Sequence, residues 1–314
     1  RRMGWCSRME SVASTVLSAG ARETAVRSAR RLDRRRMLFW VLPPVAWFSV
    51  FMLIPYALLL YTSLGKVEDM RFIPGLSLDN FIRVFTVDPY LGVILKSARI
   101  GLMTAVFSAV VAYPLAFFLA FHVRSSRFKF LIYLLVIVPW WASYLVKAYA
   151  WKTILGSGGI LNVALQKVGL TDEPVRIFLY NEFSVVMTLT YIFTPFAVLS
   201  IYAQLERIPT SLIEAARNLG AGGWMIFLRI ILPISVPGVV AGSIITFSLA
   251  FGDFVAPVLV GGPESVMVSN VVINLLGVAF DWPLAAAIGL VIITLGLLLI
   301  SASGWLEEKT QTRF

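Results

Sequence analysis

The sequence predicts an all-α integral membrane protein with six transmembrane helices, and three observations support this expectation. Of the 314 residues, 59% are hydrophobic and only 14% are charged, and the mean hydropathy is +0.84. Soluble domains carry about a quarter charged residues, so this composition disfavours a soluble enzyme. Six uncharged runs recur along the chain, and basic residues are denser in alternate connecting segments. Both features are typical of a chain that crosses a bilayer repeatedly.

The six uncharged runs have lengths between 17 and 28 residues. A helix needs roughly 20 residues to cross the hydrocarbon core. The shortest run can extend through Lys147, whose long side chain can reach the interface. A further uncharged stretch, 265–280, contains three polar interruptions and is expected to form an interfacial or re-entrant helix, not a seventh span. The expected spans are 37–64, 100–121, 130–146, 183–205, 230–252 and 282–306.

The positive-inside rule places both termini in the cytoplasm, an N-in/C-in orientation. In this orientation the inside segments hold 18 Lys and Arg residues, whereas the outside segments hold 9. Without the first 36 residues the totals are 8 and 9, but the inside residues fall within 40 positions and the outside residues within 100. The density of basic residues therefore favours this orientation. If the chain is bacterial, the two larger loops then face the periplasm.

The N-terminal segment, 1–36, is expected to form a basic cytoplasmic arm, because it holds 10 of the 27 Lys and Arg residues and only three acids. Such an arm can anchor the first span against anionic membrane lipid. Its composition would also allow an organellar transit peptide, and translation could start upstream, at Met9 or at Met37. A nucleic-acid-binding interpretation of the net charge of +10 applies at most to this arm, so no nucleic-acid partner is expected. Residues 307–314 are expected to form a cytoplasmic tail.

The common enzyme motifs are missing from the sequence. It contains no GxxxxGK[ST] phosphate-binding loop, no HExxH and no GxSxG. The single Cys6 excludes a CxxC site, and the single His122 argues against a histidine-based metal site. The six runs also contain no Asp or Glu, which ion-coupled pumps usually carry within the membrane. We therefore expect no catalytic residue, no metal and no cofactor in this chain, and a separate protein must power any work on a substrate.

The connecting segment 206–229 has the pattern of a short capped helix. Pro209 ends the fourth span, Ser211 is the expected N-cap, and Glu214 completes a capping box with it. Gly220 is a fitting stop after two turns of helix. A helix this short outside the membrane buries its apolar stripe either on the bilayer surface or in the groove of a partner.

The same segment resembles the EAA loop of permeases of ATP-binding-cassette (ABC) importers, whose pattern EAA-x3-G-x9-I-x-LP is matched at every fixed position. The resemblance implies a type I, MetI-like permease domain over 37–306, with a coupling loop at 206–233. It also implies that the short helix docks onto a separate ATPase subunit, which binds ATP and Mg²⁺. The residues implied in docking are Ser211, Glu214, Ala215, Ala216, Gly220, Ile230, Leu232 and Pro233.

Further blocks resemble the first permease subunit of spermidine/putrescine importers. The resemblance implies a multi-pass protein of the bacterial inner membrane. Its implied partners are a second homologous permease, two copies of the ATPase and an extracytoplasmic substrate-binding protein. Related branches carry ferric iron, sulfate, phosphonates or organic amines, and some permeases pair with themselves, so the sequence leaves the substrate and the pairing open. The matching blocks are 138–151, 155–162, 232–243, 252–255 and 261–262.

A polyamine or other organic amine would need acidic or aromatic groups at the outer ends of the third and fifth spans. Aromatic ring faces can hold an ammonium group there. Aromatic side chains are, however, enriched at membrane interfaces in general, and Asp253 could instead pair with Lys147 or cap a helix. The candidate pathway residues are Asp253, Trp140, Trp141, Tyr144 and Glu264.

Two other functional classes compete with an ABC permease. An ion-gradient-driven secondary transporter or channel would be expected to carry acids within its spans, and a membrane enzyme would need a catalytic constellation. The sequence has neither, and the EAA pattern argues against both classes. ATPase activity that depends on a co-purified partner would separate an ABC importer from a gradient-driven transporter.

Overall fold

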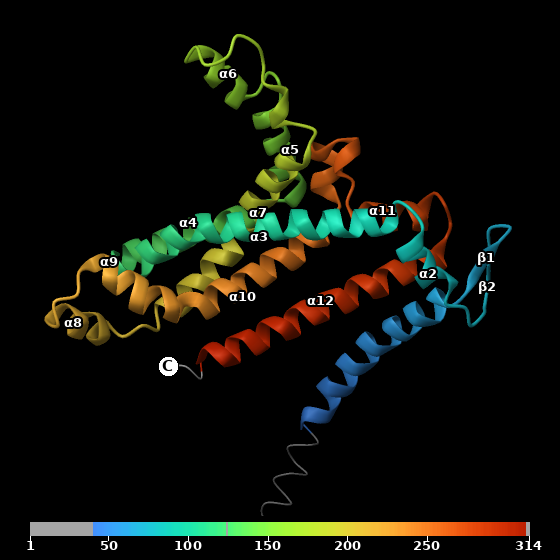
Figure 1. The fold of residues 1–314 in the computed structure, drawn as a ribbon, viewed down its shortest axis with the longest axis horizontal. Helices are drawn as coiled ribbons and strands as arrows, with labels where there is room; N and C mark the ends of the chain where they lie inside the picture. Colours follow the sequence, from blue (N-terminus) through green and yellow to red (C-terminus); the bar gives the residue numbers. More distant parts are fainter. Residues whose placement is uncertain (1–39, 124, 312–314) are drawn as a thin grey trace, which may run out of the picture. The chain divides into compact units, whose positions relative to one another are not determined.

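A computed structural model describes residues 40–123 and 125–311 (Figure 1). Contacts divide the chain after Leu59 into two units. The described part of the first unit belongs to one helix, Trp40–Ser63, which covers most of the first predicted span and ends within the second unit. The predicted arm 1–36 lies outside the described residues, as does the end of the predicted tail.

Three long helices form the core of the second unit: α3 (Tyr90–Phe121), α7 (Glu182–Leu205) and α10 (Leu232–Phe251). Each of the three packs against the other two. Within their most apolar stretches, 61% of α7 is buried but only 33% of α3. The helix of the fourth predicted span is therefore the central element, and α3 keeps a larger outward face.

Two glycines of α10 allow its backbone to approach α7 closely. A Cβ atom on Gly238 would lie 2.6 Å from the Cβ of Gln204, and one on Gly242 would lie 3.1 Å from the Cα of Ala197. Small residues permit the same close approach in membrane helix pairs generally, where van der Waals packing drives association. A larger residue at Gly238 would push the two helices apart.

α10 continues directly from two shorter elements, α9 (Gly223–Ile226) and the π-helical turn η2 (Phe227–Ile231), so that one helix runs from Gly223 to Phe251. Pro233 lies in the first turn of α10, as predicted. Proline has no N–H to donate and clashes with the carbonyl of the preceding turn. The π-helical hydrogen bond from the Leu232 N–H to the Phe227 carbonyl lies directly before Pro233.

The third predicted span is wrong as a single straight helix through Lys147. α4 (Ser126–Trp141) ends after 16 residues, and the helical segment that begins with α5 (Tyr144–Leu155) is bent by 94° from it. Pro139 in the last turn of α4 cannot donate a backbone hydrogen bond, and Ala142 has an extended backbone with ψ of 141°. An uninterrupted apolar run in the sequence does not indicate where a helix changes direction.

Beyond α5 lie a short helix, α6 (Ile160–Lys167), and a 3₁₀ turn, η1 (Arg176–Phe178). The buried Asn162 fixes the loop between them. Its amide nitrogen donates to the Gly156 carbonyl at 2.9 Å, and its amide oxygen accepts from the Val175 N–H at 2.8 Å. This loop is therefore held by a side chain despite its distance from the core (Figure 1).

The hairpin β1 (Lys66–Glu68) and β2 (Arg71–Ile73) pairs Lys66 with Ile73 and precedes α2 (Asp79–Thr86). Asn80 of α2 holds the start of this region, because its amide nitrogen donates to the carbonyls of Ser63 and Gly65, at 2.8 Å each.

The C-terminal helix α12 (Trp282–Gln311) packs against α2 and against α11 (Val268–Gly277). An ion pair of 2.9 Å between Arg83 and Asp281 reinforces this contact. α11 has ten residues, too few to span, and confirms a short helix within 265–280. The remaining turns after α10 are the π-helical η3 (Pro257–Gly261) and the 3₁₀ turn η4 (Pro263–Ser265).

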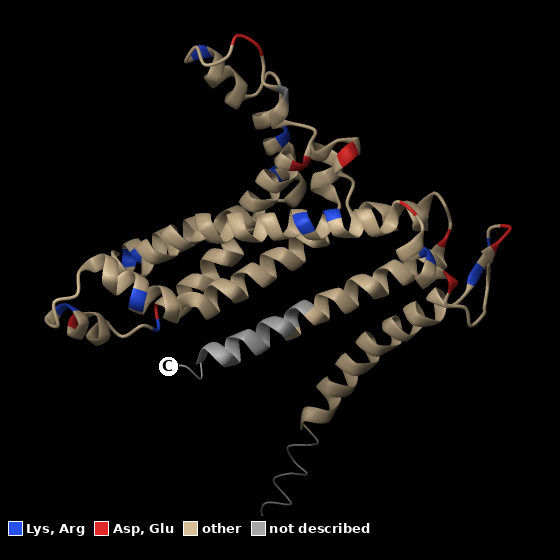
Figure 2. Ribbon diagram, viewed as in Figure 1, with Lys and Arg blue, Asp and Glu red and all other residues tan. Residues whose placement is uncertain are grey.

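Four helices in the described chain are long and apolar enough to cross a membrane, or five if the bent pair of α4 and the segment after it counts as one span. The described apolar part of α12, Trp282–Leu298, is shorter. Charged residues occur mainly near the helix ends and in connecting segments (Figure 2). The count of six spans and the N-in/C-in orientation stay predictions. The four helices are Trp40–Ser63, Tyr90–Phe121, Glu182–Leu205 and Gly223–Phe251.

Candidate functional site

The predicted helix of the 206–233 loop is α8 (Thr210–Asn218). Its N-cap is Pro209, whose extended backbone (φ −68°, ψ 133°) precedes the first helical residue, and no side chain caps this end. Ser211 is already the second helical residue, so the predicted cap at Ser211 and its capping box with Glu214 are wrong. Proline fixes φ near the value found here and cannot extend the helix backwards, so the helix starts directly after it.

The other end of α8 confirms the predicted stop at Gly220. This glycine has φ of +83°, and its N–H donates to the Arg217 carbonyl at 2.9 Å. The next N–H, of Ala221, reaches the Ala216 carbonyl at 3.0 Å. Together the two bonds form a Schellman motif, which satisfies the last carbonyls of the helix and reverses the chain.

The apolar stripe of α8 divides between two environments. Ile213 and Ala216 pack against the same cluster as the buried Ile226 and Ile231, so this side of the helix rests on its own chain. Leu219, at the end of the stripe, is 88% exposed. Glu214 and Ala215 of the EAA triplet are exposed as well. The helix is therefore seated on the bundle and presents its opposite side outward.

A cavity of about 610 Å³ lies between α8 and the adjoining helix ends. Glu214 and Arg217 line it from α8, and His122 lines it from the end of α3. Within the described chain no ion pair engages Glu214. Its carboxylate is thus available to a group from outside this chain.

The second half of the EAA pattern does not lie on α8. Ile230 belongs to the π-helical turn, and Leu232 and Pro233 begin α10, and all three are half-buried. The hydroxyls of Tyr113 and Ser235 lie 2.9 Å apart, and the Ser235 hydroxyl donates to the Leu232 carbonyl at 2.8 Å. These contacts fasten the start of α10 to α3, so this half of the pattern fixes where the loop meets the bundle.

A polar cluster that the sequence analysis missed lies where the loop leaves α7. Lys129 at the start of α4 donates to the Glu206 carboxylate at 2.7 Å, and the Tyr202 hydroxyl donates to the same oxygen at 2.7 Å. The hydrogen bond from Lys129 holds the pKa of Glu206 below its usual range. Lys129 and Glu206 lie at the ends of two predicted spans, and these two ends are expected on the same side of the membrane. This placement of opposite charges is the feature of the sequence from which the ion pair could have been predicted.

At the opposite ends of these helices, the structure brings together two of the predicted pathway residues. The Tyr144 hydroxyl at the start of α5 donates to one oxygen of Asp253, and the other oxygen accepts from the Ala256 N–H at 2.8 Å. Asp253 is only 9% exposed. It therefore caps the turn after α10 and anchors α5, and no ion pair joins it to Lys147 in the described chain.

The other predicted pathway residues are dispersed. Trp140 contacts Phe196 edge-on at 4.9 Å and lines a cavity of about 370 Å³ between α3, α4, α5 and α7. Trp141 is largely exposed. Glu264 is exposed, and it lines a different cavity, of about 560 Å³, which Glu182 also lines. The five residues do not share one cavity.

Comparisons with known proteins show the family to which this chain is similar. Residues 112–312 match a family described as binding-protein-dependent transport system inner membrane component. The chain is 35% identical over 272 residues to the spermidine/putrescine transport system permease protein PotB of Salmonella typhimurium (strain LT2), covering 84% of this chain and 93% of the relative. It is 36% identical over 269 residues to the inner membrane ABC transporter permease protein YdcU of Escherichia coli (strain K12). This match covers 81% of this chain and 84% of the relative.

Among solved structures, a chain of a bacterial ABC transporter involved in the import of the acidic polysaccharide alginate is similar, with a TM-score of 0.72. The sequence identity is 19%, and the match covers 90% of this chain and 99% of the other. At this identity the likeness concerns the fold alone.

Proposed function

Because the chain belongs to the family of inner membrane components of binding-protein-dependent transport systems, we propose that it carries a polyamine or a related organic amine across the membrane. The chain is a permease subunit of an ABC importer and a multi-pass protein of the bacterial inner membrane. The observation that supports the substrate class is the 35% identity to a spermidine/putrescine permease over 84% of the chain.

The ATPase contact is proposed to lie on α8. Glu214 and Ala215 are exposed there, and the neighbouring cavity has room for a group from another protein. In this proposal two copies of an ATPase subunit bind ATP and Mg²⁺, and one of them docks on this loop. A second homologous permease and an extracytoplasmic binding protein complete the importer. The N-in/C-in orientation then places α8 in the cytoplasm, where ATP is available.

Transmission from α8 to the membrane is proposed to be mechanical. The Schellman motif at Gly220 fixes how the chain leaves α8, and the helix that starts at Gly223 runs without interruption into α10. Closure of the ATPase dimer would pull α8, and α10 and α3 would follow because Tyr113 and Ser235 hold them together. Rigid movement of this kind opens a pathway alternately to either side.

The substrate class is tested on the importer purified through a tag on this chain. The co-purified binding protein is screened with putrescine, spermidine, other organic amines, ferric ion and oxyanions. We expect it to bind an amine, and we expect the amine-loaded binding protein to stimulate ATP hydrolysis by the importer. Exclusive binding of an oxyanion would contradict the amine proposal, and the permease assignment would be unaffected.

A further inference from the structure

The ammonium group of Lys147 on α5 is buried without an anion. The residue is 8% exposed, and no ion pair or hydrogen bond engages its side chain within the described chain. Two other lysines of the second unit have partners: Lys152, also on α5, lies over the Tyr180 ring at 5.9 Å, and Lys96 donates to the Glu264 carbonyl at 2.6 Å. Burying a charge is costly unless an opposite charge or a polar group meets it. We therefore expect a negatively charged or polar group from outside this chain to contact the Lys147 ammonium.

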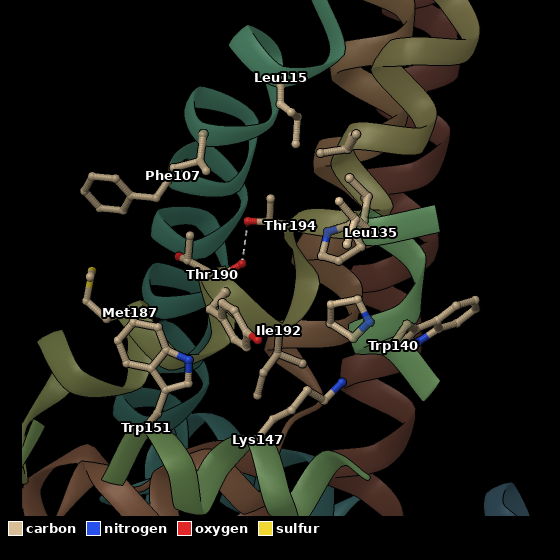
Figure 3. Close-up of a pocket in the computed structure, with 16 residues that line it drawn as sticks. Phe107, Leu115, Leu135, Trp140, Lys147, Trp151, Met187, Thr190, Ile192 and Thr194 are labelled. Carbon is tan, nitrogen blue, oxygen red and sulfur yellow. Dashed lines mark hydrogen bonds between the residues drawn. The ribbon is translucent and has the colours of Figure 1, made fainter. Parts of the chain in front are cut away.

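The side chain of Lys147 projects into the open cavity of about 370 Å³ that residues of α3, α4, α5 and α7 line. Lys147 and Trp151 enter it from α5, and Trp140 borders it from α4 (Figure 3). Nearly all other lining side chains are apolar or aromatic, such as Phe107 and Leu135. Of the two threonine hydroxyls, that of Thr194 donates to the Thr190 carbonyl at 2.6 Å, whereas that of Thr190 is buried and has no hydrogen-bond partner in the described chain. The cavity thus combines hydrocarbon walls with a single positive charge.

This combination selects against the proposed amine substrate and in favour of an anionic amphiphile. A polycation entering the cavity would meet the Lys147 ammonium in a low-dielectric surrounding, where like charges repel strongly. A hydrocarbon chain would instead gain by covering the apolar walls. An anionic head at the end of that chain would supply the missing counter-charge.

The predicted third span ends at Lys147, where the hydrocarbon core is expected to meet the lipid headgroups. This residue follows the bend at which the chain leaves the direction of α4, at the end of that helix remote from Lys129. Trp140, Trp151 and Tyr191 surround the cavity at this level, and such side chains are enriched where hydrocarbon meets headgroups. Lysine side chains near helix ends also extend toward that boundary.

We propose that the cavity binds an anionic phospholipid of the bilayer, with one acyl chain against the apolar walls and the phosphate beside the Lys147 ammonium. A zwitterionic lipid carries its own cation next to the phosphate and should bind less well. A carboxylate from the second permease could also cover Lys147, and the experiment is designed to detect that occupant.

The complete importer is purified in detergent, and retained lipid is measured by native mass spectrometry while phosphatidylglycerol or phosphatidylcholine is titrated. Lys147→Met is expected to bind phosphatidylglycerol about fivefold more weakly, the effect of one basic residue at an anionic surface. Lys147→Arg keeps the charge and should bind as the wild type does. Lys152→Met, on the same helix but outside the cavity lining, is the matched control and should also bind normally.

A second measurement on the wild-type importer does not depend on any variant folding. In lipid nanodiscs, phosphatidylglycerol should protect Lys147, but not Lys152, from an amine-reactive label, whereas phosphatidylcholine should protect neither. Equal lipid binding by the wild type and Lys147→Met would overturn the proposal. A carbodiimide crosslink between Lys147 and a carboxylate of another subunit would also overturn it, because a protein would then occupy the site.

Discussion

At the scale of single residues, Asp253 illustrates how a chemically suggestive side chain can be structural. Its two oxygens accept from the Tyr144 hydroxyl and the Ala256 N–H, and it is almost fully buried. We therefore expect Asp253→Ala to lower the amount and the thermal stability of the assembled importer. Leaving the Ala256 N–H unpaired costs about 1–3 kcal/mol. Blue-native electrophoresis and a thermal melt of the purified importer measure both effects.

Asp253→Asn separates this structural role from substrate contact. The amide oxygen can still accept from the Ala256 N–H, and the amide nitrogen can donate to the Tyr144 oxygen. We expect this variant to assemble normally and to retain uptake of the amine. Normal assembly with strongly reduced uptake would instead return the Asp253 carboxylate to the transport pathway.

At the scale of elements, α8 depends on the left-handed backbone at Gly220. No atom lies within 4 Å of a Cβ built there, so the constraint is conformational and not steric crowding by neighbours. A β-branched residue resists φ of +83°, at a cost of about 1–2 kcal/mol. We expect Gly220→Val to misdirect the chain after α8, so that ATP hydrolysis no longer drives uptake. Uptake per assembled importer in proteoliposomes is the measurement.

Gly222→Val is the matched control for this prediction. Gly222 belongs to the same loop, has open space around it and has φ of −70° with ψ of 159°, a conformation that valine adopts readily. This variant should transport at close to the normal rate. Equal loss of uptake in both variants would mean that bulk in the loop, and not the backbone at Gly220, causes the defect.

The elements also mark where sequence-based prediction works and where it stops. The stop at Gly220 and the proline in the first turn of α10 were predictable, because both follow from local backbone chemistry. The bend after Trp141 was not, since apolar composition does not encode direction. Lys129 and Glu206 were visible only as charges at helix ends, and their pairing depends on how α4 packs beside α7.

At the scale of the whole molecule, the number of spans and their orientation depend on the bent pair. If α4 and the segment after it cross the membrane together, six crossings require α12 to span as well. If the segment returns to the side on which α4 began, every later loop changes side. The charge density favours the first arrangement, because it leaves the 206–233 loop in the cytoplasm with the ATPase.

Single-cysteine labelling decides between the two arrangements. Cys6→Ser removes the only native cysteine, and Met70, Leu170 and Leu219 are exposed positions in three different connecting segments. In intact spheroplasts, a membrane-impermeant maleimide should label Met70→Cys and Leu170→Cys, whereas Leu219→Cys should react only after permeabilisation. If the bent pair is re-entrant, Leu170→Cys will be protected and Leu219→Cys will be labelled from outside. That second pattern would remove α8 from the cytoplasm and with it the proposed docking of an ATPase.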